Sequence, residues 1–284
     1  MPKKIAFLGP IGTYTDEASY LYAPSAERVP FASLGLVMSA LEEGTVDEAV
    51  VPIENSLGGT VIEVVDFLIA SEKSQIKGEF LLPIDHCLIT RPGVKLSDIR
   101  VVVSKQEALT QCRQFLAREL RFAEQVPATS TALAVVDLKE ADDRTAAIGP
   151  RRSAELAGLP VLAHGIQDRK NNVTRFAVLA SSVMPPSGSD KTTIAFDFDK
   201  PDAPGLVYGA MRPFADRGIN LTKIESRPTG TGMGNYIFLL DLEGHIDEPH
   251  VQQAITELQG RTSTFKVLGA YPRAEGMSVR QLDE

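Results

Sequence analysis

Cysteine is scarce in this sequence, which contains only Cys87 and Cys112 among 284 residues. The two cysteines form no CxxC pair, so they predict reduced, buried thiols in a cytoplasmic protein. Histidine is scarce as well, and its four positions show no metal-ligand spacing: His86, His164, His245 and His250. We therefore expect no metal site.

Long apolar runs and basic runs are also missing. No apolar stretch reaches the roughly 18 residues that a membrane span needs. The apolar run near the N-terminus covers only residues 5–8, too short for the core of a signal peptide. The formal net charge is -8 and no basic cluster occurs, so we expect neither a nucleic acid nor a membrane partner. Neither GxGxxG nor GxxxxGK[ST] is present, and no cofactor is expected.

The composition is that of an ordinary globular protein, with 43% hydrophobic and 23% charged residues. Over residues 1–181, apolar runs typical of strands alternate with amphipathic segments typical of helices. This order predicts an α/β fold with parallel strands. Strands are expected at 4–8, 47–55, 79–90, 98–104, 146–149, 161–166 and 174–181, and helices at 12–23, 33–44, 58–71, 105–120, 130–138 and 151–158.

A second domain is expected after residue 181. The segment 182–190 is rich in serine, proline and glycine and shows no periodicity, so it is interpreted as a linker. Residues 191–273 then follow the order strand, helix, strand, strand, helix, strand, which predicts a ferredoxin-like α+β module. Residues 274–284 are left as a C-terminal tail.

Polar side chains gather where the predicted strands end, and ligands of open α/β sheets bind at such ends. GPIGTYT with Thr13 follows the first strand, and Glu54, Asn55 and Ser56 follow a later one. Ser104 with Gln111 and the Ser130–Thr131 pair complete the set. The NNVTRF stretch instead lies at the start of the strand predicted over 174–181. Thr13, Ser104 and Ser130 are equally compatible with simple helix capping, and GPIGTYT with a plain βα turn.

These groups are hydroxyls, amides and helix N-termini, with one arginine and one glutamate. Such a set suits a small ligand that bears carboxylates. It could serve simple capture of a solute, or a reaction that needs mainly orientation and electrostatics. The residues alone leave both alternatives open.

Taken together, five stretches make the chain resemble prephenate dehydratase, in the monofunctional form with a C-terminal ACT regulatory domain. They are FLGPIGTYTDEA, VPIENSLGGTV, STALA, IQDRKNNVTRFAVL and GINLTKIESRP. The resemblance runs from about Ile5 to about Tyr271. It implies two lobes like those of a periplasmic binding protein, one at about 1–80 with 168–181 and the other at about 81–167, followed by the ACT domain.

The resemblance also implies the activity, the decarboxylating dehydration of prephenate to phenylpyruvate in phenylalanine biosynthesis. Thr174 would be the catalytic hydroxyl, and Glu54 is our candidate proton donor. Substrate-binding positions would be Thr13, Asn55, Ser56, Ser104, Gln111, Ser130, Thr131, Asn172, Arg175 and Phe176. In a regular strand Arg175 faces away from Thr174, so a salt bridge is the alternative for its guanidinium.

In the ACT domain the resemblance implies control by L-phenylalanine in a pocket between the subunits of a dimer or tetramer. The effector-binding residues would be Gly205, Leu206, Val207, Asn220, Leu221, Glu225, Ser226 and Arg227. Two stretches depart from the family pattern. Lys105–Glu107 replaces the usual residues between Ser104 and the QC helix, and Leu206–Tyr208 changes the glycine motif. The alternatives are arogenate dehydratase and a non-catalytic regulatory protein that binds aromatic acids.

Overall fold

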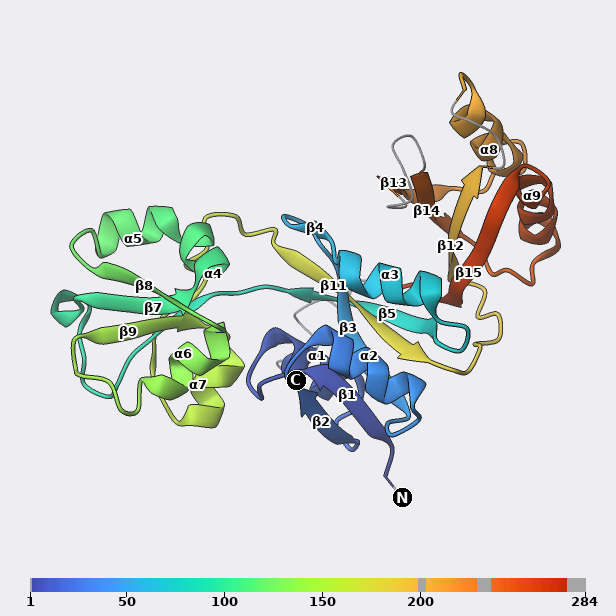
Figure 1. Cartoon of the computed structure of the whole chain (residues 1–284). Helices are drawn as coiled ribbons and strands as arrows, with labels where there is room; N and C mark the ends of the chain where they lie inside the picture. Colours follow the sequence, from blue (N-terminus) through green and yellow to red (C-terminus); the bar gives the residue numbers. More distant parts are fainter. Residues whose placement is uncertain (1, 199–202, 229–235, 275–284) are drawn as a thin grey trace. The chain divides into compact units, whose positions relative to one another are not determined.

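The computed structural model describes residues 2–198, 203–228 and 236–274 (Figure 1). The chain divides into two compact units. Unit 1 holds the described residues up to 61 together with 81–176, and unit 2 holds 62–80 together with the described residues from 177 onward. Within the described residues, no helix combines the length and the apolarity needed to cross a bilayer.

The first sheet runs in the strand order β2-β1-β3-β11-β5. Its strands are β2 (Glu27–Phe31), β1 (Lys4–Leu8), β3 (Glu48–Asn55), β11 (Val173–Ala180) and β5 (Gln75–Pro83), and β4 (Gly59–Thr60) pairs with β3. β1 is parallel to both β2 and β3. The helices of this part of unit 1 are α1 (Tyr14–Tyr22) and α2 (Leu34–Glu42). The carboxyl ends of β1 and β3 thus lie at one edge, where the polar stretches begin.

The second sheet of unit 1 has the strand order β10-β6-β9-β7-β8. These strands are β10 (Val161–Ala163), β6 (Cys87–Ile89), β9 (Thr145–Gly149), β7 (Val101–Lys105) and β8 (Glu124–Ala128). Its helices are α4 (Gln106–Gln111), α5 (Arg113–Glu119), α6 (Thr131–Asp137) and α7 (Arg151–Ala157), with a short 3₁₀ turn at Leu96–Asp98.

Helices cover both faces of this second sheet (Figure 1). Leu88 and Ile148 point to one face and pack with Leu109 and Leu116 from α4 and α5. Cys87 and Ile89 point to the other face and pack with the buried side of α6 and α7. Because both faces are covered, the inner strands β6, β7 and β9 are mainly apolar rather than alternating.

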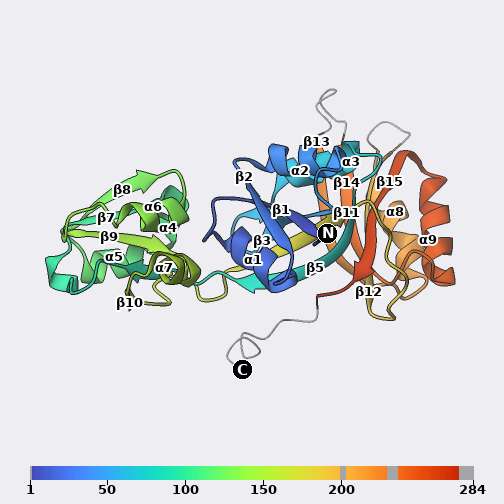
Figure 2. The same cartoon turned by 90° about the horizontal axis from the view of Figure 1, so that it is seen from below.

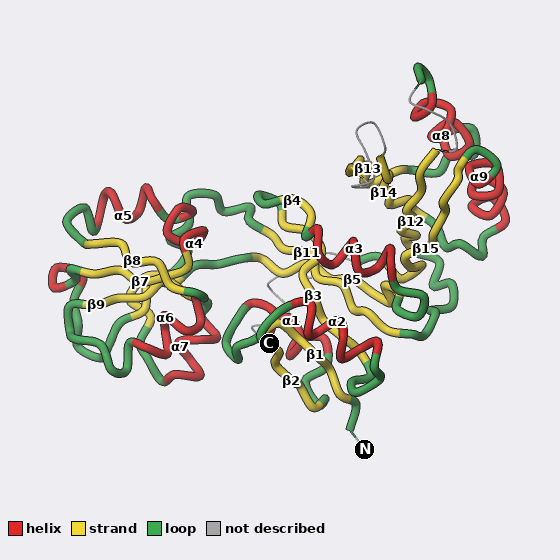
Figure 3. The backbone as a smooth tube through the Cα atoms, in the orientation of Figure 1, coloured by secondary structure: helices red, strands yellow, loops and turns green. Residues whose placement is uncertain are grey.

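Unit 2 contains α3 (Ile62–Ala70) and a four-stranded antiparallel sheet in the order β13-β14-β12-β15. Its strands are β12 (Asp190–Phe198), β13 (Leu221–Pro228), β14 (Tyr236–Glu243) and β15 (Thr262–Pro272). Helix α8 (Leu206–Ala215) follows β12, and helix α9 (Pro249–Gln259) follows β14. Figure 2 shows α8 and α9 on the same side of the sheet, where they bury a shared apolar core. Figure 3 shows the segment between β11 and β12 as loop.

The predicted fold class is confirmed. Residues 2–180 form two α/β lobes, each with its own sheet. The C-terminal module has the ferredoxin-like order βαββαβ. Three strands were not predicted among the described residues: β2, β4 and β8. β2 and β8 each contain a proline, Pro30 and Pro127. Both lie at sheet edges, where a residue without an N–H is tolerated.

The helix predicted over 105–120 is wrong in one respect, because the chain breaks it at Cys112 (φ -108°, ψ 14°). Asp168 causes the break. Its backbone N–H donates to the Gln111 carbonyl at 2.7 Å, and its carboxylate accepts from the Gln114 N–H at 3.0 Å. Both groups would otherwise bond within the helix. The helix predicted over 58–71 also starts later, at Ile62, because Gly59 and Thr60 form β4.

Candidate active site

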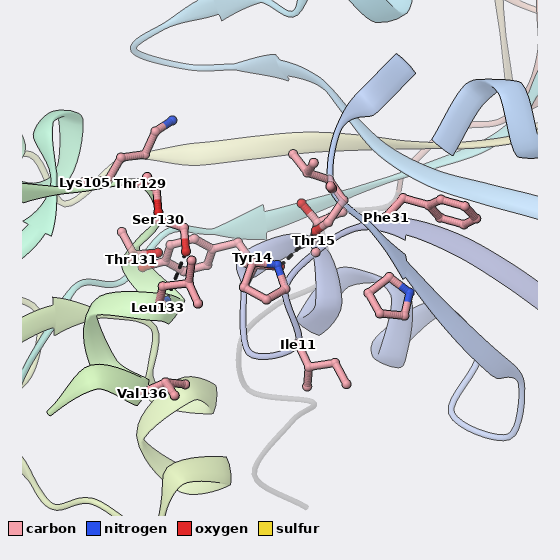
Figure 4. A pocket seen from close by; sticks show the side chains of 16 residues that line it. Ile11, Tyr14, Thr15, Phe31, Lys105, Thr129, Ser130, Thr131, Leu133 and Val136 are labelled. Carbon is pink, nitrogen blue, oxygen red and sulfur yellow. Dashed lines mark hydrogen bonds between the residues drawn. The ribbon is translucent and has the colours of Figure 1, made fainter. Parts of the chain in front are cut away.

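A cavity of about 900 Å³ opens in unit 1 between the end of β1 and the start of α6 (Figure 4). Ile11, Tyr14 and Phe31 lie on one side of it, and Lys105, Ser130, Thr131, Leu133 and Val136 lie on the other. The lining is mainly apolar, with hydroxyls and one ammonium group around it. An aromatic or near-aromatic acid matches this mixture of surfaces.

Three residues that we expect to bind substrate, Thr13, Ser130 and Thr131, line this cavity. Two of their hydroxyls also serve as helix caps. Thr13 Oγ1 accepts from the Asp16 N–H and donates to the Leu8 carbonyl, both at 3.2 Å. Ser130 Oγ accepts from the Leu133 N–H at 3.0 Å, so its own proton is available to a ligand.

The glycine turn before α1 is used within the protein rather than held open for an anion. Gly12 has φ +92°, and its N–H donates to Asp16 Oδ2 at 3.0 Å. A Cβ at this position would meet Ser153 Oγ at 2.8 Å. Glycine is therefore required here by backbone conformation and by close packing.

A second, smaller cavity of about 410 Å³ is lined by Gln111 and Asn172 together with charged side chains of the same region. The charged members are Arg113, Asp168 and Arg169. Asn172 is 2% exposed and donates from Nδ2 to Gln111 Oε1 at 3.0 Å. The structure thus brings together two predicted substrate-binding residues that are 61 positions apart in the chain.

Asn55 is in contact with Thr174. Asn55 Nδ2 donates to Thr174 Oγ1 at 2.9 Å and to Asn172 Oδ1 at 2.8 Å. Because the Thr174 oxygen accepts from Asn55, the hydroxyl proton of Thr174 is directed elsewhere and can be donated to a ligand. A hydroxyl that accepts one hydrogen bond is also a better donor in the next.

Ser56 holds the segment that leads into β11. Its Oγ donates to the Asn171 carbonyl at 3.1 Å and accepts from the Val173 N–H at 3.0 Å. The backbone N–H of Ser56 also donates to the Val173 carbonyl at 2.9 Å. Ser56 therefore fixes the backbone immediately before Thr174, and its hydroxyl is used in doing so.

Arg175 forms the salt bridge that the sequence left as an alternative. Its Nη1 lies 3.3 Å from Glu54 Oε2, and the two side chains are 10% and 35% exposed. In this contact Glu54 Oε2 accepts a hydrogen bond from Arg175 Nη1, so that oxygen is used as an acceptor. This arrangement does not favour the proton-donor role expected for Glu54.

Several predicted site residues line neither of these two cavities: Glu54, Asn55, Ser56, Ser104, Thr174, Arg175 and Phe176. Ser104 is 0% exposed and its hydroxyl donates to the Ile148 carbonyl at 2.6 Å. The expected capping role is wrong, because the N-cap position of α4 is Lys105. Phe176 is 1% exposed and lies within the protein interior. The neighbouring Lys105, one of the departures from the family pattern, does line the larger cavity.

Sequence reasoning missed Asp16, which is 1% exposed and paired with two arginines. Arg28 Nη1 lies 2.7 Å from Asp16 Oδ1, and Arg152 Nε lies 2.7 Å from Asp16 Oδ2. Arg28 and Asp16 belong to the first lobe of unit 1, while Arg152 belongs to α7 in the second. Arg152 is 136 residues from Asp16 in the chain, so no local sequence pattern could reveal this ion pair.

The residues predicted to bind the effector separate into two groups within the ACT domain. Leu221 pairs with Leu242, which pairs with Thr192 near the start of β12. Asn220–Leu221 therefore lies at that end of the sheet. Gly205–Val207 begins α8 after β12 has ended, and Gly209 approaches Arg261 next to the start of β15. The two groups are at opposite ends of the sheet in one chain.

The remaining three predicted effector residues lie along β13, at Glu225–Arg227. Glu225 pairs with Lys223 at 3.4 Å, and Arg227 Nη1 lies 2.5 Å from Asp66 of α3 in the same unit.

Among the described residues, no cluster of three or more histidine, cysteine or acidic side chains could hold a metal ion.

The chain is similar to known proteins over nearly its whole length. A family model described as prephenate dehydratase matches residues 5–183, and the ACT domain model matches residues 200–260. Prephenate dehydratase of Mycolicibacterium vanbaalenii is 36% identical, with 99% of this chain and 95% of the relative covered. Arogenate dehydratase 2 of Petunia hybrida is 35% identical, with 97% and 73% covered.

The chain is also similar to a solved structure over nearly its whole length. The prephenate dehydratase of Arthrobacter aurescens, crystallised in complex with L-Phe, aligns with a TM-score of 0.88 at 35% identity. The alignment covers 97% of this chain and 92% of that one.

Proposed function

We propose that Thr174 and Asn55 form the centre of the active site in this chain, which belongs to the prephenate dehydratase family and carries an ACT domain. The reaction converts prephenate to phenylpyruvate, carbon dioxide and water. The observation that supports this assignment is the 2.9 Å hydrogen bond from Asn55 Nδ2 to Thr174 Oγ1. It leaves the Thr174 proton available to a ligand.

The substrate supplies most of the driving force, because its ring becomes aromatic. The bond to the ring carboxylate breaks, its electron pair enters the ring, and the ring hydroxyl leaves and takes up a proton to become water. Thr174 donates a hydrogen bond to that departing hydroxyl and orients it. An aliphatic hydroxyl is a weak acid, so its contribution is mainly orientation and stabilisation of developing charge.

The two substrate carboxylates need donors and positive charge. Ser130 and Lys105 on the rim of the larger cavity are suited to one of them, because the Ser130 proton is free and the lysine is cationic. Arg175, held in place by Glu54, is the candidate for the other. A guanidinium positioned by a carboxylate binds anions with defined geometry.

Control by L-phenylalanine is proposed at the ACT domain, as the A. aurescens complex suggests for that relative. Gly205–Val207 and Asn220–Leu221 lie at opposite ends of one ACT sheet. A pocket that uses both groups therefore needs a second copy of the chain. This supports a homo-oligomer, and we expect a cytoplasmic dimer or tetramer.

The plant relative supports arogenate as a second candidate substrate, which has an amine where prephenate has a keto group. The test is to measure the loss of prephenate and of arogenate by the full chain, with and without L-phenylalanine. We expect prephenate to be the better substrate by kcat/KM, and its turnover to fall when L-phenylalanine is added. Faster consumption of arogenate would reassign the substrate, and binding of either acid without turnover would make the chain a non-catalytic binding protein.

A further inference from the structure

Three side-chain amides, those of Asn55, Asn172 and Gln111, form a continuous hydrogen-bonded row, which we call the amide row. The backbone fixes its direction at one end. The N–H groups of Leu57 and Gly58 both donate to Asn55 Oδ1 at 2.9 Å. A backbone N–H is always a donor, so the oxygen of Asn55 is identified and its Nδ2 must face the other way.

This direction passes along the whole row. Asn55 Nδ2 donates to Asn172 Oδ1 at 2.8 Å, so Asn172 turns its nitrogen toward Gln111. Asn172 Nδ2 then donates to Gln111 Oε1 at 3.0 Å. The same Gln111 oxygen lies 2.9 Å from Nε2 of His86. An amide oxygen can only accept, so the imidazole must carry a proton on Nε2.

Tyr14 completes the arrangement on the other side of the imidazole. Its hydroxyl oxygen lies 3.0 Å from His86 Nδ1, and the two rings meet edge to face at 5.8 Å between centroids. His86 is 3% exposed, and burial lowers the pKa of its imidazole. The neutral ring with its proton on Nε2 has a lone pair on Nδ1. The Tyr14 hydroxyl also donates to the Asp85 carbonyl oxygen at 2.9 Å, so its single proton is shared between that oxygen and Nδ1.

We infer that His86 is a positioning residue of the active site, because its Nε2–H holds Gln111 in the orientation that the amide row requires. The inference rests on the proposed role of Thr174, which receives its hydrogen bond from Asn55 at the end of this row. Tyr14 supports His86 by binding the opposite nitrogen. His86 was interpreted from the sequence as a core histidine at a strand end, and its contacts give it this further role.

The physical reason is that a terminal amide can rotate by half a turn at little cost unless both of its ends are specified. Without the donor at His86 Nε2, the Gln111 oxygen keeps Asn172 Nδ2 as its remaining partner in the row, so the Gln111 amide is held at one point and can shift. Asn172 then shifts with it, and the hydrogen bond from Asn55 to Thr174 is disturbed. A misplacement of about 1 Å at reacting groups can reduce turnover about 100-fold.

Two variants separate this role from simple core packing. In His86→Gln, the side-chain amide reaches the position of the imidazole Nε2 and can still donate to Gln111. In His86→Asn, the shorter amide reaches only the position of Nδ1. We expect kcat for prephenate to stay within about fivefold of wild type in His86→Gln and to fall about 10- to 100-fold in His86→Asn. KM should change by less than about threefold in both.

A spectroscopic measurement tests the same idea without turnover. Nitrogen-15 NMR of the full wild-type chain should show His86 neutral at pH 7, with its proton on Nε2. In Tyr14→Phe the proton should stay on Nε2, since Gln111 still accepts it, and kcat should fall by about threefold. The control is Tyr22→Phe, which removes a hydroxyl bonded to Glu48 at 2.8 Å, outside the amide row. It should leave kcat unchanged.

Equal kcat values for His86→Gln and His86→Asn, or a proton on Nδ1 in the wild-type protein, would overturn the inference. Failure of the proposed function is distinguishable from this outcome. If the wild-type chain does not turn over prephenate, the proposed function fails, while the NMR signal still decides whether His86 orients Gln111. Thermal unfolding of each variant shows whether it is folded.

Discussion

Replacing Asp16 by alanine should strongly destabilise unit 1. The carboxylate is 1% exposed and accepts from three groups: Arg28 at 2.7 Å, Arg152 at 2.7 Å and the Gly12 N–H at 3.0 Å. Removing it leaves two guanidinium groups without their shared partner. Arg28 and Arg152 also stack on the Tyr20 ring, at 5.1 and 4.5 Å from its centroid, so they cannot move freely into water.

The magnitude follows from these contacts. Breaking a buried ion pair by removing one member costs about 3–5 kcal/mol. Here the arginines remain 22% and 17% exposed and keep part of their hydration. We therefore expect the lower end of that range, a loss of about 3 kcal/mol in the free energy of unfolding for Asp16→Ala.

Urea unfolding of the full chain, followed by circular dichroism, measures this loss. The matched control is Asp143→Ala, which removes an exposed partner of Arg91 in the same unit (3.2 Å, 39% and 76% exposed). It should cost about 0.5 kcal/mol or less. A loss below about 1 kcal/mol for Asp16→Ala, close to the control, would refute the argument that this buried carboxylate holds unit 1 together.

Three further predictions concern other parts of the chain. Burial raises the pKa of Cys87 to about 11 and that of Cys112 to about 12 from 9.0. The two neutral thiols therefore make their full contribution to stability below pH 9, and this contribution is lost as the pH rises through 11 to 12. Thermal unfolding at several pH values should show a larger loss of stability over this range for wild type than for the double alanine variant. Gly269→Ala should cost at least about 2 kcal/mol in urea unfolding, because the added Cβ would clash with the backbone carbonyl oxygen of Ile76. Lys105→Gln should raise KM for prephenate about two- to fivefold and leave kcat unchanged in steady-state assays, since it removes one partly exposed positive charge from the cavity rim.

The sequence predicted most of the elements, because buried parallel strands are continuously apolar and the helices between them carry a clear apolar face. It failed at β2 and β8. Each is a short edge strand interrupted by proline, at Pro30 and Pro127, and neither shows the apolar run of an interior strand. It also failed at Cys112, because the break there depends on hydrogen bonds from Asp168, which is remote in the chain.

The candidate site was predicted in part for a similar reason. Asn55 was selected because it ends a predicted strand, and Thr174 because it begins one within a stretch that resembles the family; the structure places them in contact. The direction of a side chain cannot be read in the same way. Ser104 follows its strand as expected, yet its hydroxyl points to a backbone carbonyl in the interior. His86 contacts Tyr14 and Gln111, which are remote from it in the chain, so local residue spacing does not predict these contacts.

The central claim is that the Thr174 hydroxyl, directed by Asn55, assists departure of the substrate hydroxyl. Steady-state kinetics of Thr174→Val with prephenate tests it most directly, since valine keeps the shape of threonine and removes only the hydroxyl. We expect kcat to fall about 100- to 1000-fold, the usual cost of losing one donor to developing charge, with KM within about threefold of wild type. An unchanged kcat, or a large rise in KM alone, would contradict the account.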